Sequence, residues 1–258
     1  MKILAIMGSP RKGDSYKLTQ LIETKLKHLG EVELKYILLK EVNLGYCRGC
    51  SVCMKKGEQF CPLEDDALMI REEMLNADGL ILVSPVYVHQ VTAVMKIFID
   101  RFAYALHRPC FLDKSAIIIS TTELSGLEDV LDYLEFNARL WGFHVVHKLG
   151  VIAPAFKQAP GYRNTRLKEI EETAKKFFDA LETKKRPSPD MYDLKHFNAL
   201  KIKVKLHQKQ YPCDYSYWQK NGWLDKDYFF DTHINVLKHF FVWVIVKRIE
   251  RMIRKNFT

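Results

Sequence analysis

Short apolar runs and helix-forming stretches alternate along the first 183 residues of this 258-residue chain. The apolar runs predict strands, most of them buried on both faces of a sheet, at 2–7, 32–39, 79–83, 116–120 and 143–152. Apolar side chains that recur every three or four residues predict helices at 15–29, 65–75, 92–106, 127–140 and 164–181. Neighbouring parallel strands need such crossover helices, so the alternation predicts an α/β fold with a doubly wound, five-stranded parallel sheet.

The positive charge of the chain lies in its last part. The formal net charge is +9, and residues 184–258 contain 16 Lys and Arg against 7 Asp and Glu, whereas residues 1–183 contain 24 of each kind. Residues 184–190 (KKRPSPD) have the composition of a linker. We therefore predict an α/β domain at 1–183 and a basic, aromatic-rich, mostly helical extension at 184–258, with helices at 194–206 and 232–255.

Neither end of the chain carries a membrane-targeting pattern. Residues 1–7 form too short an apolar run for a signal peptide, and the run at 240–246 covers about a third of the roughly 20 residues that span a bilayer. We expect a cytoplasmic protein without a transmembrane segment. The amphipathic final helix is expected to pack on its own or a neighbouring subunit, with contact to a membrane surface as the alternative.

The loop after the first strand reads GSPRKGDS, residues 8–15, and leads into the first helix. Successive backbone amides and a helix dipole hold a phosphate in that geometry. The loop is neither a Walker A sequence nor G-x-G-x-x-G, so a monophosphate is favoured over a pyrophosphate. Ser9 and Ser15 supply hydroxyls and Arg11 a cation, while an ordinary polar turn is the alternative.

Four cysteines interrupt the α/β pattern in the loop 44–63. Cys47, Cys50, Cys53 and Cys61 have the spacing C-x2-C-x2-C-x7-C, and Pro62 follows the last of them. Three thiolates at intervals of three residues can cap different irons of one cubane, which favours a [4Fe-4S] cluster. Structural zinc sites usually have two separated pairs of ligands, yet zinc and a redox dithiol or relic remain alternatives.

Three motifs in this order resemble the iron-sulfur flavoproteins, a branch of the flavodoxin-like, NAD(P)H-dependent FMN reductase superfamily. The motifs are GSPRKGDS, then CRGCSVC with Cys61 and Asp65-Asp66, then SPVY followed by MKIFIDR, and the resemblance spans residues 1–182. It implies a flavodoxin-like sheet of order 2-1-3-4-5, FMN at the switch point of the sheet, and a [4Fe-4S] cluster on the four cysteines.

The resemblance also implies roles for individual residues. The FMN phosphate would be surrounded by Ser9, Arg11, Lys12 and Ser15. The isoalloxazine would lie along Pro85, Val86 and Tyr87, with their backbone amides stabilising a flavin anion and Tyr87 packing on the ring. Thr121 and Thr122 would contribute from the fourth loop, which lacks the glycine-rich stretch of relatives.

Two further features of the flavin region follow from the sequence. Asp14 departs from the expected pattern because it places a carboxylate in the phosphate loop, where it would weaken anion binding. His89 is close to the presumed flavin edge and is either a proton relay or a hydrogen-bonded loop histidine. We expect Lys96, Asp100 and Arg101 to be structural, and no protein side chain is predicted to be an essential catalytic group.

The expected function is electron transfer between a one-electron donor such as ferredoxin and an acceptor reduced by FMN. The basic extension would attract an acidic ferredoxin-like partner. A second hypothesis is an NAD(P)H-dependent flavin, quinone or nitroaromatic reductase without a functional cluster, and a third is a zinc-stapled binding protein. We expect a homodimer or homotetramer, and no nucleic-acid partner.

Overall fold

The computed structural model describes the backbone of residues 1–153 and 159–257, and the side chains there except those at 239–240, 249–250 and 252–257. It contains a five-stranded sheet whose neighbouring strands are all parallel, in the order β2-β1-β3-β4-β5. The strands are β1 (Lys2–Met7), β2 (Glu33–Leu38), β3 (Gly79–Pro85), β4 (Ser115–Thr122) and β5 (His144–Ile152). The predicted α/β fold and its strand order are confirmed.

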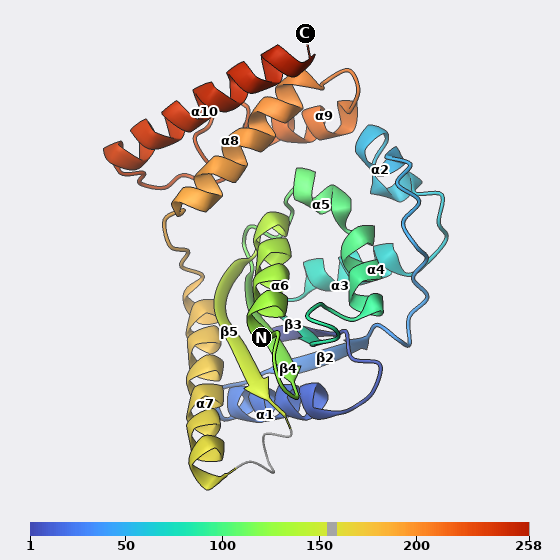
Figure 1. Cartoon of the computed structure of the whole chain (residues 1–258), viewed down its shortest axis with the longest axis vertical. Helices are drawn as coiled ribbons and strands as arrows, with labels where there is room; N and C mark the ends of the chain where they lie inside the picture. The colour runs from blue at the N-terminus through green and yellow to red at the C-terminus, as the bar shows by residue number, and fades with distance from the viewer. Residues whose placement is uncertain (154–158, 258) are drawn as a thin grey trace. The chain divides into compact units, whose positions relative to one another are not determined.

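Two helices cover one face of this sheet: α1 (Asp14–Leu29) and α7 (Pro160–Thr183) (Figure 1). Alternate residues of the central strands, such as Ala5, Ile81 and Ile117, are buried in one cluster with apolar side chains of both helices. Packing of α7 on the sheet is so close that a Cβ on Gly79 would lie 2.6 Å from Leu181 Cδ2. A larger residue at the start of β3 would force the Leu181 and Phe177 side chains to move, so Gly79 allows this close packing.

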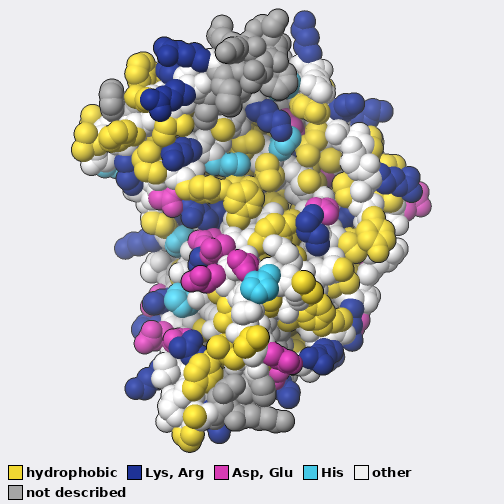
Figure 2. Space-filling view, viewed as in Figure 1, with side chains coloured by type: hydrophobic (Ala, Val, Ile, Leu, Met, Phe, Trp, Pro, Cys, Tyr) yellow, Lys and Arg dark blue, Asp and Glu magenta, His cyan; other side chains and the backbone are white. Residues whose placement is uncertain are grey.

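The other face is covered by α3 (Ala67–Asn76), α4 (Ala93–Arg101) and α6 (Leu127–Trp141) (Figure 1). The Phe98 ring lies 4.7 Å from Phe102 and 5.6 Å from Trp141, and all three are fully buried. Figure 2 shows acidic side chains gathered over α6 and β5 on the face in view. On α6, Asp132 and Glu135 form ion pairs with Lys148 of β5.

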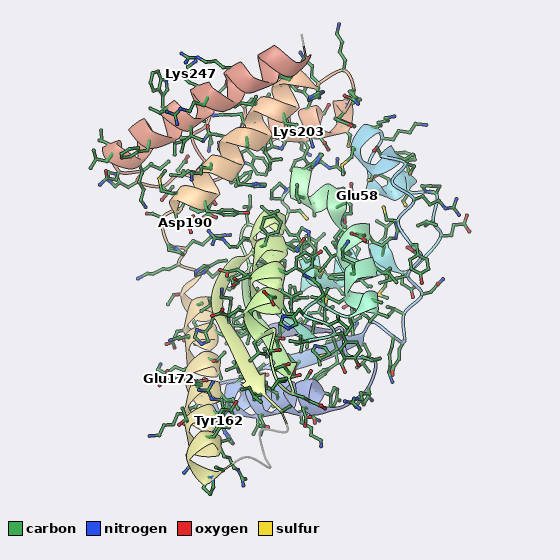
Figure 3. The ribbon with its side chains drawn as sticks, viewed as in Figure 1. Glu58, Tyr162, Glu172, Asp190, Lys203 and Lys247 are labelled. Atoms are coloured by element: carbon green, nitrogen blue, oxygen red, sulfur yellow. The ribbon has the colours of Figure 1, made fainter. Side chains whose placement is uncertain are left out.

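The bounds of most predicted helices shift by a few residues in the structure; the last one, predicted at 232–255, is α10 (Val236–Phe257). The predicted helix 92–106 is divided into α4 and α5 (Ala103–His107), because Phe102 has φ −98° and ψ 14° and ends the first of them. Helix α7 begins earlier than predicted, at Pro160, where proline suits the first turn because it lacks an amide hydrogen. Figure 3 marks Tyr162 in that turn, and its hydroxyl accepts a hydrogen bond from the Ile152 amide at the end of β5.

The chain divides into two compact units, 1–50 with 63–185 and 51–62 with 186–258. The second unit contains α2 (Val52–Lys55), η1 (Glu58–Phe60), α8 (Met191–Leu206), α9 (Pro212–Lys220) and α10 (Val236–Phe257). Asp190, labelled in Figure 3, caps α8 through a reciprocal hydrogen-bond pair with Asp193. The helical character predicted for the extension is confirmed.

Aromatic rings form the core of the second unit. Phe197 and Trp218 are fully buried with centroids 5.4 Å apart, and Phe229 lies 4.8 Å from both Phe197 and Trp223. The aromatic-rich part of the sequence thus gives the extension a hydrophobic core of its own. Among the helices that the structure describes, none combines the length and the apolar character that crossing a membrane would require.

Candidate functional site

A cleft of about 310 Å³ lies at the carboxyl ends of β1, β3 and β4, where ligands bind in open α/β sheets. Its volume is at the lower end of the range for small-molecule pockets. Of the nine residues predicted to surround FMN, eight line it: Ser9, Arg11, Ser15, Pro85, Val86, Tyr87, Thr121 and Thr122. The ninth, Lys12, is not in the lining, and its ammonium group lies 5.5 Å from the centroid of the Tyr16 ring.

The phosphate end of the cleft is a loop fixed by its own hydrogen bonds. Ser9 Oγ donates to the Arg11 carbonyl at 2.6 Å and accepts from the Arg11 amide at 3.3 Å. The hydroxyls of Ser15 and Thr121 are 2.6 Å apart, which joins the start of α1 to the end of β4. The amides in the first turn of a helix have no acceptor within the helix, and no side chain at Gly13 caps α1 in their place. This loop fits a phosphate group, with Arg11 as an exposed cation beside it.

Asp14 also lines the cleft, in the first turn of α1. Its carboxylate interacts favourably with the helix dipole but repels a phosphate in the same place. We expect Asp14→Asn to lower the Kd for FMN by about threefold, since charge interactions at a helix N-terminus are worth about 0.3–1 kcal/mol. Fluorescence titration of the apoprotein measures this change.

Riboflavin, which has no phosphate, is the control ligand for that titration, and its affinity should be the same in wild type and Asp14→Asn. Asp113→Asn is the control variant, because that carboxylate is 79% exposed and lies outside the cleft lining. A parallel gain for FMN and riboflavin would mean that Asp14 does not act on the phosphate.

The second wall of the cleft is the tight turn between β3 and α4. Tyr87 and Gln90 exchange backbone hydrogen bonds of 2.8 and 3.0 Å around Val88 and His89. Both turn residues have positive φ, 50° for Val88 and 58° for His89, which is a strained conformation for the β-branched valine. The Val88 side chain is 96% exposed, so this strain positions an apolar group at the mouth of the cleft.

The geometry corrects one expectation about this wall. The Val86 amide donates to the Thr121 carbonyl at 2.8 Å and the Tyr87 amide donates to Gln90, while Pro85 has no amide hydrogen. These backbone groups are therefore not available to stabilise a flavin anion. The resemblance to the iron-sulfur flavoproteins indicated that residues 85–87 lie beside the flavin. It did not indicate that the turn from Tyr87 to Gln90 uses their amide hydrogens within the protein.

The third wall is the loop between β4 and α6. Thr122 Oγ1 donates to the Ser125 carbonyl at 2.6 Å, and Leu124 is 85% exposed at the rim. Gly126 has φ 83°, and a Cβ there would lie 2.9 Å from Val86 Cγ1. Glycine at this position therefore allows the loop after β4 to pack closely against the loop after β3. The lining residues that the sequence did not single out are Gly13, Val88, Glu123, Leu124, Ser125 and Ala153. Ala153 directly follows β5. Because ligands bind beyond the carboxyl ends of parallel strands, its place in the lining could have been predicted from the end of the predicted strand.

His89 connects the second and third walls. Its Nδ1 lies 2.7 Å from Asp129 Oδ2 and its Nε2 lies 3.2 Å from Ser125 Oγ. Asp129 belongs to the first turn of α6, whereas Ser125 and His89 both line the cleft. The histidine is thus a hydrogen-bonded loop residue that also faces the cleft.

The cysteine segment is rich in turns. Gly49, Ser51 and Gly57 have φ of 64°, 57° and 117°, and none of the six cysteines forms a disulfide bond. Cys47 and Cys50 lie in the first unit, whereas Cys53 and Cys61 lie in the segment grouped with the second. Among the side chains that the structure describes, no three His, Cys, Asp or Glu are arranged to hold a metal ion. The four thiols suit an iron-sulfur cluster by their chemistry.

A buried ion pair closes the base of the cysteine segment. Arg101 of α4 donates to Asp65 through Nη2 at 2.8 Å and Nε at 3.1 Å, and the two side chains are 6% and 4% exposed. Asp65 also accepts from the amides of Gly45 and Ala67, and Asn43 and Asp66 hydrogen-bond each other beside it. Residues 43–45 are thereby held to 65–67, on either side of the four cysteines. The structural role expected for Arg101 is observed, and its partner explains the position of Asp65.

Comparison with known proteins gives matches over most of the chain. The family model described as NADPH-dependent FMN reductase matches residues 1–158. A protein named iron-sulfur flavoprotein from Archaeoglobus fulgidus is 33% identical over 87% of this chain and 100% of its own length. Another from Clostridioides difficile is 31% identical over 86% of this chain and 99% of its own.

Solved structures with the same fold are more distant in sequence. A flavone reductase superposes with a TM-score of 0.56 at 17% identity, over 70% of this chain and 63% of its own. RosB, solved with 8-demethyl-8-formylriboflavin-5'-phosphate, has a TM-score of 0.53 at 15% identity, over 92% of each chain. At these identities the likeness establishes the fold.

Proposed function

The chain belongs to the NADPH-dependent FMN reductase family, in its iron-sulfur flavoprotein branch, and on that premise we propose that it transfers electrons between two redox centres. It is a flavin-dependent oxidoreductase that binds FMN. The second centre of the proposal is a [4Fe-4S] cluster on Cys47, Cys50, Cys53 and Cys61. The observation that carries the proposal is that one chain has both a cleft whose lining fits a phosphate and four thiols within 15 residues of sequence.

The three walls of the cleft have distinct tasks in binding FMN. The first turn of α1 and Arg11 bind the phosphate, and Ser9 and Ser15 keep that loop in shape. The exposed apolar side chains of Tyr87, Val88 and Leu124 give the ring system an apolar contact and exclude water from one side. When bound, FMN accepts and gives electrons singly or in pairs.

The cysteine set is the proposed one-electron centre. Four thiolates within 15 residues match the ligand number of a [4Fe-4S] cluster, and such a cluster exchanges single electrons. Arg48, Lys55 and Lys56 lie among these thiols in the sequence and offset their negative charge. Pairing such a centre with FMN joins a one-electron donor to a two-electron acceptor.

An acidic ferredoxin-like protein is the proposed donor. The segment 184–258 has 16 basic against 7 acidic residues, and a surface of that sign accelerates the approach of an anionic partner. The rate of reduction should therefore fall as ionic strength rises, because salt screens the attraction.

Anaerobic stopped-flow spectroscopy tests this proposal directly. The FMN-loaded protein is mixed separately with reduced ferredoxin, NADH and NADPH, and the bleaching of the flavin is followed. We expect rapid, salt-sensitive reduction by ferredoxin and slow reduction by either nicotinamide. Rapid reduction by a nicotinamide alone would favour the simple reductase, which the family description supports as the second candidate.

A further inference from the structure

We propose that Ser125, His89 and Asp129 form a proton relay on the wall of the flavin cleft, which protonates an organic acceptor as it is reduced. The inference rests on the proposed function, because it requires FMN and an acceptor in this cleft. It extends the proton-relay hypothesis for His89 to a defined set of side chains by adding Ser125 and Asp129.

The relay is a continuous chain of hydrogen bonds. Asp129 Oδ2 lies 2.7 Å from His89 Nδ1, and Ser125 Oγ lies 3.2 Å from His89 Nε2. A carboxylate beside Nδ1 fixes the tautomer in which Nδ1 carries the proton. Nε2 is then the nitrogen that takes up a proton from solvent and passes it to the serine hydroxyl.

The backbone conformation positions these three side chains beside the cleft. His89 has φ 58° in the turn fixed by Tyr87 and Gln90, and Gly126 with φ 83° allows the next wall to approach the His89 backbone. Asp129 lies in the first turn of α6, where the helix dipole favours a carboxylate. Ser125 and His89 line the cleft together with the flavin-binding residues, so a proton leaving Ser125 is delivered inside it.

The chemistry of a quinone shows why the relay is needed. In two-electron reduction, one carbon-oxygen double bond receives two electrons and one proton from the reduced flavin, which is oxidised. The second oxygen then carries a negative charge and requires one more proton. Ser125 gives that proton from its hydroxyl, takes one from the His89 imidazolium, and His89 regains its proton from solvent. General acid catalysis of this kind contributes about 10²–10⁴-fold in typical enzymes.

A merely structural role of His89 predicts something different. Its two hydrogen bonds also tie the two walls together, and losing them would disturb the cleft for every acceptor equally. Ferricyanide separates the two roles, because it takes one electron and no proton. The informative quantity is the ratio of the rates with 1,4-benzoquinone and with ferricyanide, measured on the FMN-loaded protein.

The experiment compares wild type with His89→Gln, Asp129→Asn and Ser125→Ala, and uses His28→Gln on α1 as the matched control. We expect the quinone-to-ferricyanide ratio to fall at least about tenfold in His89→Gln and Ser125→Ala, and to be unchanged in the control. The solvent deuterium isotope effect on quinone reduction should also decrease in the two variants. Asp129→Asn should lower the ratio less, since the imidazole is retained.

Nitrogen-15 NMR of labelled histidine gives a readout that does not depend on turnover. In the neutral state we expect the His89 ring to carry its proton on Nδ1, and this preference to be lost in Asp129→Asn. An unchanged ratio in His89→Gln, or an equal loss with both acceptors, would overturn the relay. Failure of wild type to reduce even ferricyanide would instead refute the proposed function.

Discussion

Replacing Asp65 with asparagine is expected to lower the free energy of unfolding by about 3–5 kcal/mol, the usual cost of breaking a buried ion pair from one side. The substitution leaves the Arg101 guanidinium buried without its counter-charge, and it weakens the hydrogen bonds from Gly45 and Ala67. Because these bonds close the base of the cysteine segment, iron content should fall as well. Urea unfolding followed by circular dichroism, with iron analysis of the same preparations, measures both effects.

Two controls keep this result interpretable. Asp113→Asn removes an exposed carboxylate from the same unit and should change stability by less than about 0.5 kcal/mol. The double variant Asp65→Leu with Arg101→Met removes both charges and should be less destabilised than Asp65→Asn. If Asp65→Asn were as stable as wild type, the ion pair would not be the element that holds these segments together.

The same ion pair predicts a pH dependence. Burial by itself raises the pKa of Asp65, but the hydrogen bonds from Arg101, Gly45 and Ala67 outweigh it and hold the pKa below the usual range. A carboxyl with a lowered pKa stabilises the fold above its unfolded value of about 3.9 and loses that contribution as pH falls through the folded value. The stability difference between wild type and Asp65→Asn should therefore be full at neutral pH and shrink below about pH 4.

Cys50→Ser is expected to remove the cluster while leaving FMN bound. A serine oxygen is a poor substitute for a thiolate at iron, so the iron and sulfide content should fall to a small fraction of the wild-type value. Cys50 is not part of the cleft lining, so the Kd for FMN should stay within about twofold of wild type. Iron, sulfide and FMN assays on anaerobically purified protein measure this outcome.

Cys110→Ser is the matched control, because Cys110 lies outside the four-cysteine motif and in the first unit. It should retain the full complement of iron, sulfide and FMN. Equal iron content in Cys50→Ser and wild type would exclude Cys50 as a ligand and would contradict the assignment of the motif.

The sheet could be predicted because its central strands are continuous apolar runs in the sequence, such as Leu80 to Val83. Such runs are typical of strands in a sheet that is covered by helices on both faces. The position of the cleft followed from the same topology, since loops after parallel strands meet at one edge. Individual side chains were less predictable. Lys12 belongs to the phosphate loop in sequence, yet its ammonium group lies over the Tyr16 ring. The side chain of an exposed lysine is oriented by local contacts, here by the attraction between a cation and an aromatic ring.

Contacts over long sequence separations were beyond prediction. The Asp65–Arg101 pair joins residues 36 positions apart, and each appeared in a separate motif with no sign that they meet. Likewise, the turn at Val88 and His89 has two positive φ angles without the glycine or asparagine that usually marks such a turn. The aromatic segment after 211 gave no helical period, so α9 was missed, although its Trp218 is fully buried.

One chain is expected to carry both FMN and a [4Fe-4S] cluster. The most direct test is anaerobic purification followed by a visible spectrum and by iron, sulfide, zinc and FMN assays on one sample. We expect about four irons, about four sulfides and one FMN per chain, with a broad absorbance that bleaches on dithionite. FMN without iron would contradict the second centre and leave a simple flavin reductase, and zinc in place of iron would contradict it as well.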